Sequence, residues 1–162
     1  MEILRILNDW LHLTMAVIWI GGIHYHFVIL GTTARELPAE AQGALTMGTF
    51  KRFTRIVWAS VLVLLVTGVS KGIYLKAFGG LFVTTYGWIL GIKLLLVVAM
   101  IVVAGLFSFV FGPQLKSLLN QSSETPNPEL TALQKKMSML VRTNLLLGML
   151  ILLAVVMLAA TT

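Results

Sequence analysis

Four long apolar runs constrain what this chain can fold into more than any other feature. They lie at about residues 10–30, 56–75, 86–111 and 141–160, and each approaches or exceeds the roughly 20 residues that a helix needs to cross hydrocarbon. Charged residues make up 11% of the chain, whereas soluble domains carry about 25%. Because the runs are continuous rather than alternating, they do not suit a transmembrane β-barrel. The sequence therefore predicts an all-α membrane protein, a single domain over residues 1–162 with four transmembrane helices in an antiparallel bundle.

The polar segments around the runs set the expected helix bounds, which are about 10–30, 56–75, 86–111 and 128–160. The last helix begins early because Asn127 can cap it, Pro128 suits its first position and Glu129 suits its first turn. We expect these first turns to project from the bilayer. The first run is longer than the roughly 7–15-residue core of a signal peptide, so we expect it to be retained.

Basic residues are distributed unevenly between the two sides of the predicted bundle. Most of the twelve Lys and Arg residues lie in or beside the connections between helices 1 and 2 and between helices 3 and 4: Arg35, Lys51, Arg52, Arg55, Lys116, Lys135, Lys136 and Arg142. Cytoplasmic loops carry this excess in membrane proteins, so we expect these connections to be cytoplasmic and both termini extracytoplasmic. The sequence shows no basic patch interleaved with aromatics, so we expect the chain to meet the lipid bilayer and not nucleic acid.

All three histidines lie in the segment WLHLTMAVIWIGGIHYHF, residues 10–27. Five residues of this segment recur at steps of three and four and so share one helix face: His12, Met15, Trp19, Gly22 and His26. We expect this face to point into the bundle, where Gly21 and Gly22 let a neighbouring helix approach closely. His24 points about 200° away from His26, so we interpret it as structural or lipid-facing.

Lys93 is the only charged residue within the third run, and Met100 lies one heptad further along the same face. We expect Lys93 in the outer half of the bilayer, at a depth comparable to that of His12 and Met15. An uncompensated lysine in hydrocarbon costs about 2.5–3.5 kcal/mol on insertion scales, which indicates a function. The alternative explanation is that its long side chain reaches the headgroups by snorkelling.

The second helix adds Lys71 and Tyr74 near the same outer face, together with a close-packing pair formed by Gly68 and Gly72. At the inner face, we expect His26 to lie near Asn144 and several arginines. We interpret those arginines mainly as determinants of topology.

Three interpretations of these residues remain open. In the first, His12, Met15 and Met100 form a copper site near the outer face, because imidazole and thioether suit copper, and Cu(I) in particular. In the second, the chain binds haem b with His12 as an axial ligand and Lys93 as the opposite ligand or a propionate partner. Lys71 and Tyr74 then meet the propionates, and His26 holds a second haem, with bis-histidine ligation requiring a homodimer. In the third, the chain is an accessory subunit without a cofactor.

Other chemistry finds little support in the sequence. The chain has no cysteine, which excludes disulfides and thiolate sites. Hydrolysis and phosphoryl transfer are not expected, because no carboxylate lies inside an apolar run and no phosphate-binding glycine loop occurs.

The sequence resembles the CopD-type copper-resistance membrane domain over about its first three helices. The resemblance rests on WLHLTMAVIWIGG in the first, FKRFTRIVWASVLVLLVTG entering the second and TTYGWILGIKLLLVVAMIVVA in the third. The chain is also similar, more distantly, to the HemJ-type protoporphyrinogen oxidases, through His12, Trp19, Trp88 and Lys93.

The CopD resemblance implies copper uptake, passage or tolerance in the inner membrane of bacteria, with a periplasmic metal carrier as partner. The chain lacks the larger multi-helix body of full-length CopD proteins, so we expect a stand-alone module or a subunit of a membrane complex. The HemJ resemblance implies haem b, an electron carrier as partner, His12 as a haem ligand and a role for Lys93. Copper is favoured because the similarity runs more strongly through the CopD-like segments.

Overall fold

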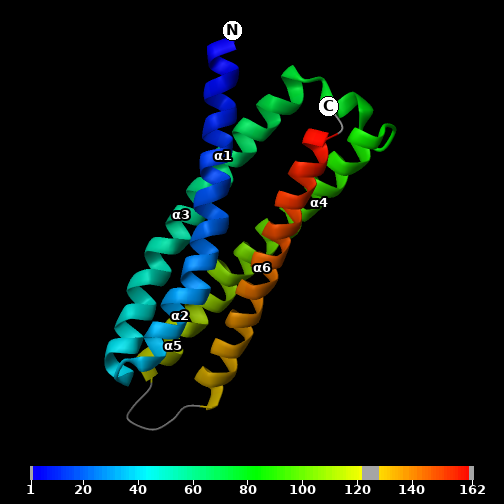
Figure 1. Ribbon diagram of the computed structural model, residues 1–162. Helices are drawn as coiled ribbons and strands as arrows, with labels where there is room; N and C mark the ends of the chain where they lie inside the picture. Colours follow the sequence, from blue (N-terminus) through cyan, green and yellow to red (C-terminus); the bar gives the residue numbers. More distant parts are fainter. Residues whose placement is uncertain (1, 122–127, 161–162) are drawn as a thin grey trace.

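The chain is all-helical over the residues that the computed structural model describes, which are 2–121 and 128–160. Four helical segments in this part are long and apolar enough to cross a membrane: Glu2–Thr33, Ala41–Tyr74, Thr85–Leu119 and Pro128–Ala160. They form the elongated molecule of Figure 1. The prediction of an all-α chain with four apolar spans is confirmed.

Each span is built from the following elements. The first contains α1 (Glu2–His24), the π-helical turn η1 (Tyr25–Leu30), α2 (Gly31–Thr33) and the 3₁₀ turn η2 (Ala34–Glu36). The second is α3 (Ala39–Tyr74), which is followed by the 3₁₀ turn η3 (Ala77–Gly80). The third contains α4 (Thr85–Gly105), the π-helical turn η4 (Leu106–Phe111) and α5 (Gly112–Gln121), and the fourth is α6 (Pro128–Ala160).

The helices extend well beyond the apolar runs, so the predicted bounds of the first two were too narrow. The first helix begins at Glu2 rather than near residue 10, and α3 begins at Ala39 rather than near residue 56. Apolarity marks only the lipid-facing part of a helix, whereas the helix itself reaches as far as a residue that interrupts it, as Pro38 does directly before α3. The start of α6 at Pro128 is confirmed, while the proposed cap Asn127 lies outside the described residues.

The four spans pack as two pairs. The helix α1 lies against α3, α4 lies against α6, and α1 also touches α6. The start of α1 and the end of α6 lie at one end of the molecule, which we call the upper end, and α5 lies at the lower end (Figure 1). One core joins all four spans, because partly buried residues of α6 such as Leu145 pack against buried residues of the other three: Trp19, Ile23, Val57, Val61, Met100 and Ala104. A second core, toward the lower end, contains Leu115, Leu133 and Met137.

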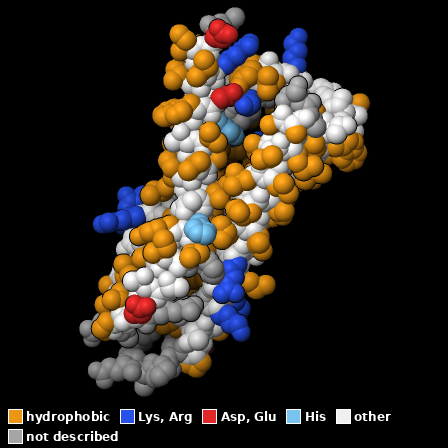
Figure 2. Space-filling model, viewed as in Figure 1, with side chains coloured by type: hydrophobic (Ala, Val, Ile, Leu, Met, Phe, Trp, Pro, Cys, Tyr) orange, Lys and Arg blue, Asp and Glu red, His pale blue; other side chains and the backbone are white. Residues whose placement is uncertain are grey.

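The surface is apolar to a degree that suits lipid rather than water. Leu62, Val66 and Leu95 are each more than 60% exposed, and Figure 2 shows a band of hydrophobic side chains between the charged groups of the upper end and the basic groups further down. The interior, in contrast, holds the polar side chains of Ser60 and Thr67, which are 1% and 4% exposed. Contiguous apolar surface of this kind marks a membrane contact.

The connection between α3 and α4 folds back onto the helices that it joins. The ring of Phe78 covers Gly72, and the ring of Phe82 covers Gly91. The carbonyl group of Gly80 lies against Gly87, where a methyl group would overlap it. The hydroxyl of Thr84 caps α4 by accepting a 3.0 Å hydrogen bond from the Gly87 N–H. Glycine at position 87 therefore allows a backbone contact that no other residue would allow.

Gly87→Ala should lower the unfolding temperature of the purified protein, because the new methyl group displaces the backbone of Gly80. Gly105→Ala is the matched control, since Gly105 is also in α4 and has open space around it. In a helix this exchange ordinarily stabilises by about 0.5–1 kcal/mol. Equal unfolding temperatures for the two variants would show that the Gly80–Gly87 contact does not constrain the connection.

Candidate functional site

The His12 ring lies against α3 near the upper end of the molecule. Its Nδ1 is 2.7 Å from the hydroxyl oxygen of Thr67, which is itself 2.6 Å from the carbonyl oxygen of Val63. Because the hydroxyl donates its proton to that carbonyl, it accepts from His12, and this assigns the ring proton to Nδ1. The lone pair of Nε2 is then available, and no hydrogen bond to Nε2 occurs within the described residues.

Gly68 lets the His12 ring approach α3 so closely. A Cβ atom at position 68 would lie 3.3 Å from Cε1 of the ring. The predicted packing pair of Gly68 and Gly72 is thus divided, because Gly68 accommodates His12 of α1 and Gly72 accommodates Phe78 of the connection.

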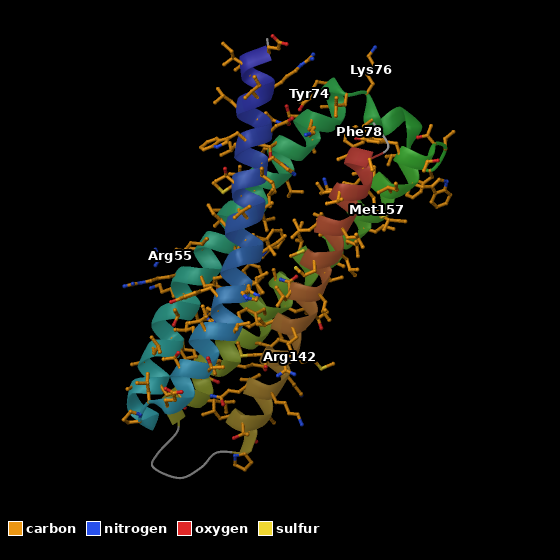
Figure 3. The ribbon with its side chains drawn as sticks, viewed as in Figure 1. Arg55, Tyr74, Lys76, Phe78, Arg142 and Met157 are labelled. Carbon is orange, nitrogen blue, oxygen red and sulfur yellow. The ribbon has the colours of Figure 1, made fainter. Side chains whose placement is uncertain are left out.

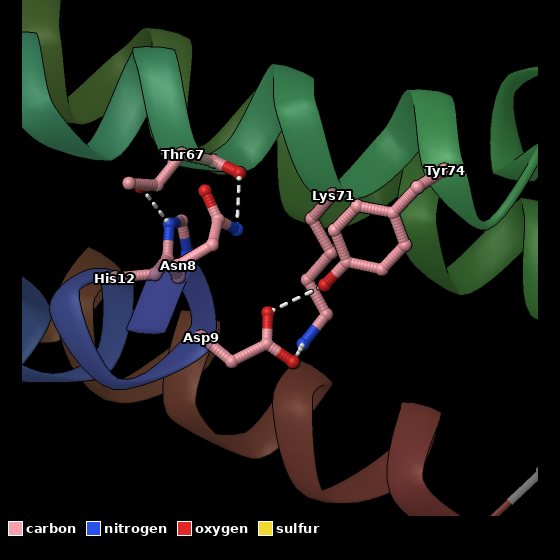
Figure 4. Close-up of polar contacts among 6 residues, drawn as sticks. All are labelled: Asn8, Asp9, His12, Thr67, Lys71 and Tyr74. Atoms are coloured by element: carbon pink, nitrogen blue, oxygen red, sulfur yellow. Dashed lines mark hydrogen bonds and ion pairs between the residues drawn. The ribbon is translucent and has the colours of Figure 1, made fainter. Parts of the chain in front are cut away.

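A carboxylate that the sequence analysis did not single out connects the two helices beside His12. Asp9 forms a 2.9 Å ion pair with Lys71 and accepts a 2.6 Å hydrogen bond from the hydroxyl of Tyr74. Asn8 donates to the carbonyl of Thr67 at 3.1 Å. We call these six residues the polar seam: Asn8, Asp9, His12, Thr67, Lys71 and Tyr74 (Figure 4).

Lys93 lies near the polar seam from the side of α4. Its charge acts on both His12 and Lys71, and the similarity in depth between Lys93 and His12 stays a prediction. Its side chain is half-buried and makes no hydrogen bond or ion pair within the described residues. Lys93 therefore adds a positive charge that no ion pair within the described residues compensates.

The two candidate thioethers take different positions. Met15 faces α3, where its sulfur accepts from the Ser60 hydroxyl at 3.9 Å. Met100 is 1% exposed and belongs to the core shared by the four spans. Within the described residues there is no group of three or more His, Cys, Asp or Glu side chains that could hold a metal ion. A metal at this end would therefore depend on imidazole and thioether donors.

The predicted inward face of the first span is confirmed. Trp19 is 3% exposed, Gly22 lies against the ring of Phe53, and the His26 ring is centred 4.9 Å from that same ring. His24, in contrast, is exposed.

The residues expected at the inner level are not one cluster. Asn144 is 7% exposed inside the bundle, and Nε2 of His26 is buried without a hydrogen bond among the described residues. Arg52, Arg55 and Arg142 are exposed, and Figure 3 shows Arg55 and Arg142 on the outside of the helices. The arginines therefore do not line a shared site with His26.

A comparison of the sequence with models of known protein families identifies the family of this chain. The model of the family described as CopD, copper resistance protein D, matches residues 47–158. The chain belongs to the CopD family. This match covers the second to fourth spans, so it includes Lys71, Lys93 and Met100, whereas the resemblance seen in the sequence lay in the first three. His12 and Met15 precede the matched residues.

A curated relative is similar over part of its length. The copper transport protein CutJ of Bacillus subtilis (strain 168) is 35% identical over 102 residues, which are 62% of this chain and 18% of the relative. The chain therefore spans less than a fifth of the relative's length. No solved structure matches. These findings support a copper-related, multi-pass membrane protein and give no support to the HemJ resemblance or to haem.

The ion pair between Asp9 and Lys71 can be measured with a double-mutant cycle of Asp9→Asn and Lys71→Gln. We expect a coupling in the free energy of unfolding of about 0.2–1 kcal/mol, because both side chains are 42% exposed and water screens them. Unfolding by SDS from mixed micelles provides the measurement. A cycle that pairs Asp9→Asn with Lys76→Gln is the control, and equal couplings in the two cycles would contradict a specific contact.

Proposed function

We propose that this protein is a four-span antiparallel bundle of the bacterial inner membrane that passes copper from the extracytoplasmic side. The family and the name of the curated relative support copper. The start of α1 and the end of α6 both lie at the upper end (Figure 1). Most of the basic residues lie in or beside the connections at the lower end. The positive-inside rule then assigns the upper end to the extracytoplasmic side.

His12 is the proposed entry ligand, and its bond to Thr67 is the observation that carries the proposal. That bond leaves the Nε2 lone pair available, as a metal-binding histidine requires when its other nitrogen is held by a hydrogen bond. Met15 is three residues further along α1 on the same face. Imidazole and thioether together suit the soft ion Cu(I).

Lys93 favours the monovalent ion. Coulomb repulsion from its ammonium group is twice as large for a divalent as for a monovalent cation at the same distance. Lys71 adds less repulsion, because Asp9 compensates its charge. The site therefore binds Cu(I) in preference to Cu(II), and binds it weakly.

Weak binding suits passage rather than storage. A conducting site must bind its ion well enough to admit it and loosely enough to release it. Two donors on one helix and an opposing ammonium group meet both conditions. Met100, in the core below, is the proposed next thioether.

His12→Gln should weaken Cu(I) binding by at least about tenfold, because it removes the ligand nitrogen. Competition with a chromophoric Cu(I) chelator under reducing conditions measures the affinity of the protein in lipid nanodiscs. His24→Gln is the matched control, since His24 lies on the same helix but is exposed. Thr67→Val should weaken binding as well, because Nδ1 of His12 then loses its hydrogen-bond partner and the ring is no longer held in one orientation.

Two outcomes would contradict the copper proposal. Equal affinities for His12→Gln and His24→Gln would remove His12 as the copper ligand on which the proposal rests. A Soret band that shifts when dithionite is added to the purified protein would instead support haem b, with His12 as an axial ligand.

Lys93→Leu should strengthen Cu(I) binding by about tenfold, because it removes a positive charge from a medium of low dielectric constant and adds no copper ligand. The same chelator competition measures the change, and Lys116→Leu, at an exposed lysine of α5, is the control. Weaker binding in the Lys93 variant would show that the lysine supports the site and does not oppose the ion.

A further inference from the structure

A mostly apolar pocket lies inside the bundle, and Ile23, Val57 and Ala104 of the core that joins the four spans line part of it. Its volume is about 30 Å³, and its walls include residues of α1, α3, α4, η4 and α6. Three of the lining side chains are polar and come from three different spans: Thr54, Ser108 and Asn144. None of them belongs to the polar seam at the upper end.

Two of these side chains present oxygen atoms that lack partners. Oδ1 of Asn144 and Oγ1 of Thr54 are buried without a hydrogen bond among the described residues. Asn144 as a whole is 7% exposed. Ser108 accepts a 3.3 Å hydrogen bond from the Trp58 indole, so its own proton remains to be donated. A buried polar group without a partner costs about 1–3 kcal/mol, and the pocket therefore calls for a ligand that donates hydrogen bonds.

The size and chemistry of the pocket select that ligand. A volume of about 30 Å³ exceeds the roughly 10–15 Å³ that a cavity needs to hold a water molecule. Water donates two hydrogen bonds and can also accept one, which matches two oxygen acceptors and one hydroxyl donor. A hard cation would need about six oxygen ligands, and an anion would face the Asn144 and Thr54 oxygens without a positive charge in the lining.

The basic residues beside the pocket place it near the membrane surface. Thr54 directly precedes the exposed Arg55, and Asn144 lies two residues after the exposed Arg142. Arg55 and Lys71 bound a stretch of α3 without charge, and 16 residues at 1.5 Å each separate them by about 24 Å. That length is close to the thickness of the hydrocarbon layer, so Arg55 marks the lower boundary. Ser108 lies in η4, and π-helical turns of this kind often occur at functional sites.

We propose that the pocket of Thr54, Ser108 and Asn144 binds a water molecule that exchanges with the aqueous phase on the side of Arg55 and Arg142. Through this pocket, water then reaches the interior of the bundle from the lower end. This inference stands apart from the copper proposal, because it uses none of the same residues.

The cysteine-free chain allows a direct test. Ser108→Cys introduces the only thiol of the protein, and its S–H stretching band is followed by infrared spectroscopy after transfer of nanodiscs into D₂O. A bound, exchanging water should replace S–H by S–D. The matched control is Val110→Cys, also in η4 but 43% exposed on the outside of the bundle, where it faces lipid.

We expect the Ser108→Cys thiol to exchange at least about tenfold faster than the Val110→Cys thiol, because exchange requires contact with water. Adding Asn144→Leu to Ser108→Cys should slow exchange by about tenfold, since the leucine fills the pocket and removes an acceptor. A Ser108→Cys thiol that keeps its S–H band would show a dry pocket and overturn the proposal. Equal rates at the two positions would overturn it too, because exchange would then reflect the membrane surface.

A second pair of variants covers a Ser108→Cys protein that fails to fold. Thr54→Cys probes the same pocket from α3, and Ala59→Cys, exposed on α3, is its control. Fast exchange in Thr54→Cys alone supports the proposal, and its absence overturns it. Copper affinity is measured separately, so a dry pocket and a failed copper site give different results.

Discussion

The hydrogen bonds between α1 and α3 are the constraint on which the upper end of this structure depends. Lipid tails are as apolar as leucine, so burying apolar side chains between two spans gives little net stabilisation within a bilayer. Polar contacts and close packing must hold the first span instead. The polar seam provides both, through Asp9 with Lys71 and Tyr74, and through His12 with Thr67 above Gly68. The orientation of the imidazole, and with it any metal chemistry, follows from this contact.

The two polar regions of the bundle differ in their chemistry. The upper region presents nitrogen and sulfur donors in His12 and Met15, together with ammonium groups. The pocket of Thr54, Ser108 and Asn144 offers hydroxyl and amide groups among mostly apolar side chains. A soft ion prefers the first set and water prefers the second. If copper moves through the bundle, this difference favours capture at the upper end and release toward a hydrated lower end.

The sequence was sufficient for the parts of the fold and site that depend on local pattern. The apolar runs predicted the four spans, the step of three and four residues predicted the face that carries His12 and Trp19, and Pro128 predicted the start of α6. The sequence did not predict the extension of α1 to Glu2 or of α3 to Ala39, because polar residues continue a helix without adding to its apolarity.

The sequence alone therefore determined the number of spans, the family and the inward face of the first helix. Each of these follows from local patterns along one chain: apolar runs, characteristic segments and the spacing of residues on a helix. What only the tertiary structure decided is which side chains meet. Thr67 and Asp9 find their partners on another helix 55 and 62 residues away, and Thr54, Ser108 and Asn144 meet from three spans. Such pairings depend on the rotation and depth of one helix against another. The packing of glycines and polar groups between spans sets this rotation and depth, and such packing produces no periodic pattern in the sequence.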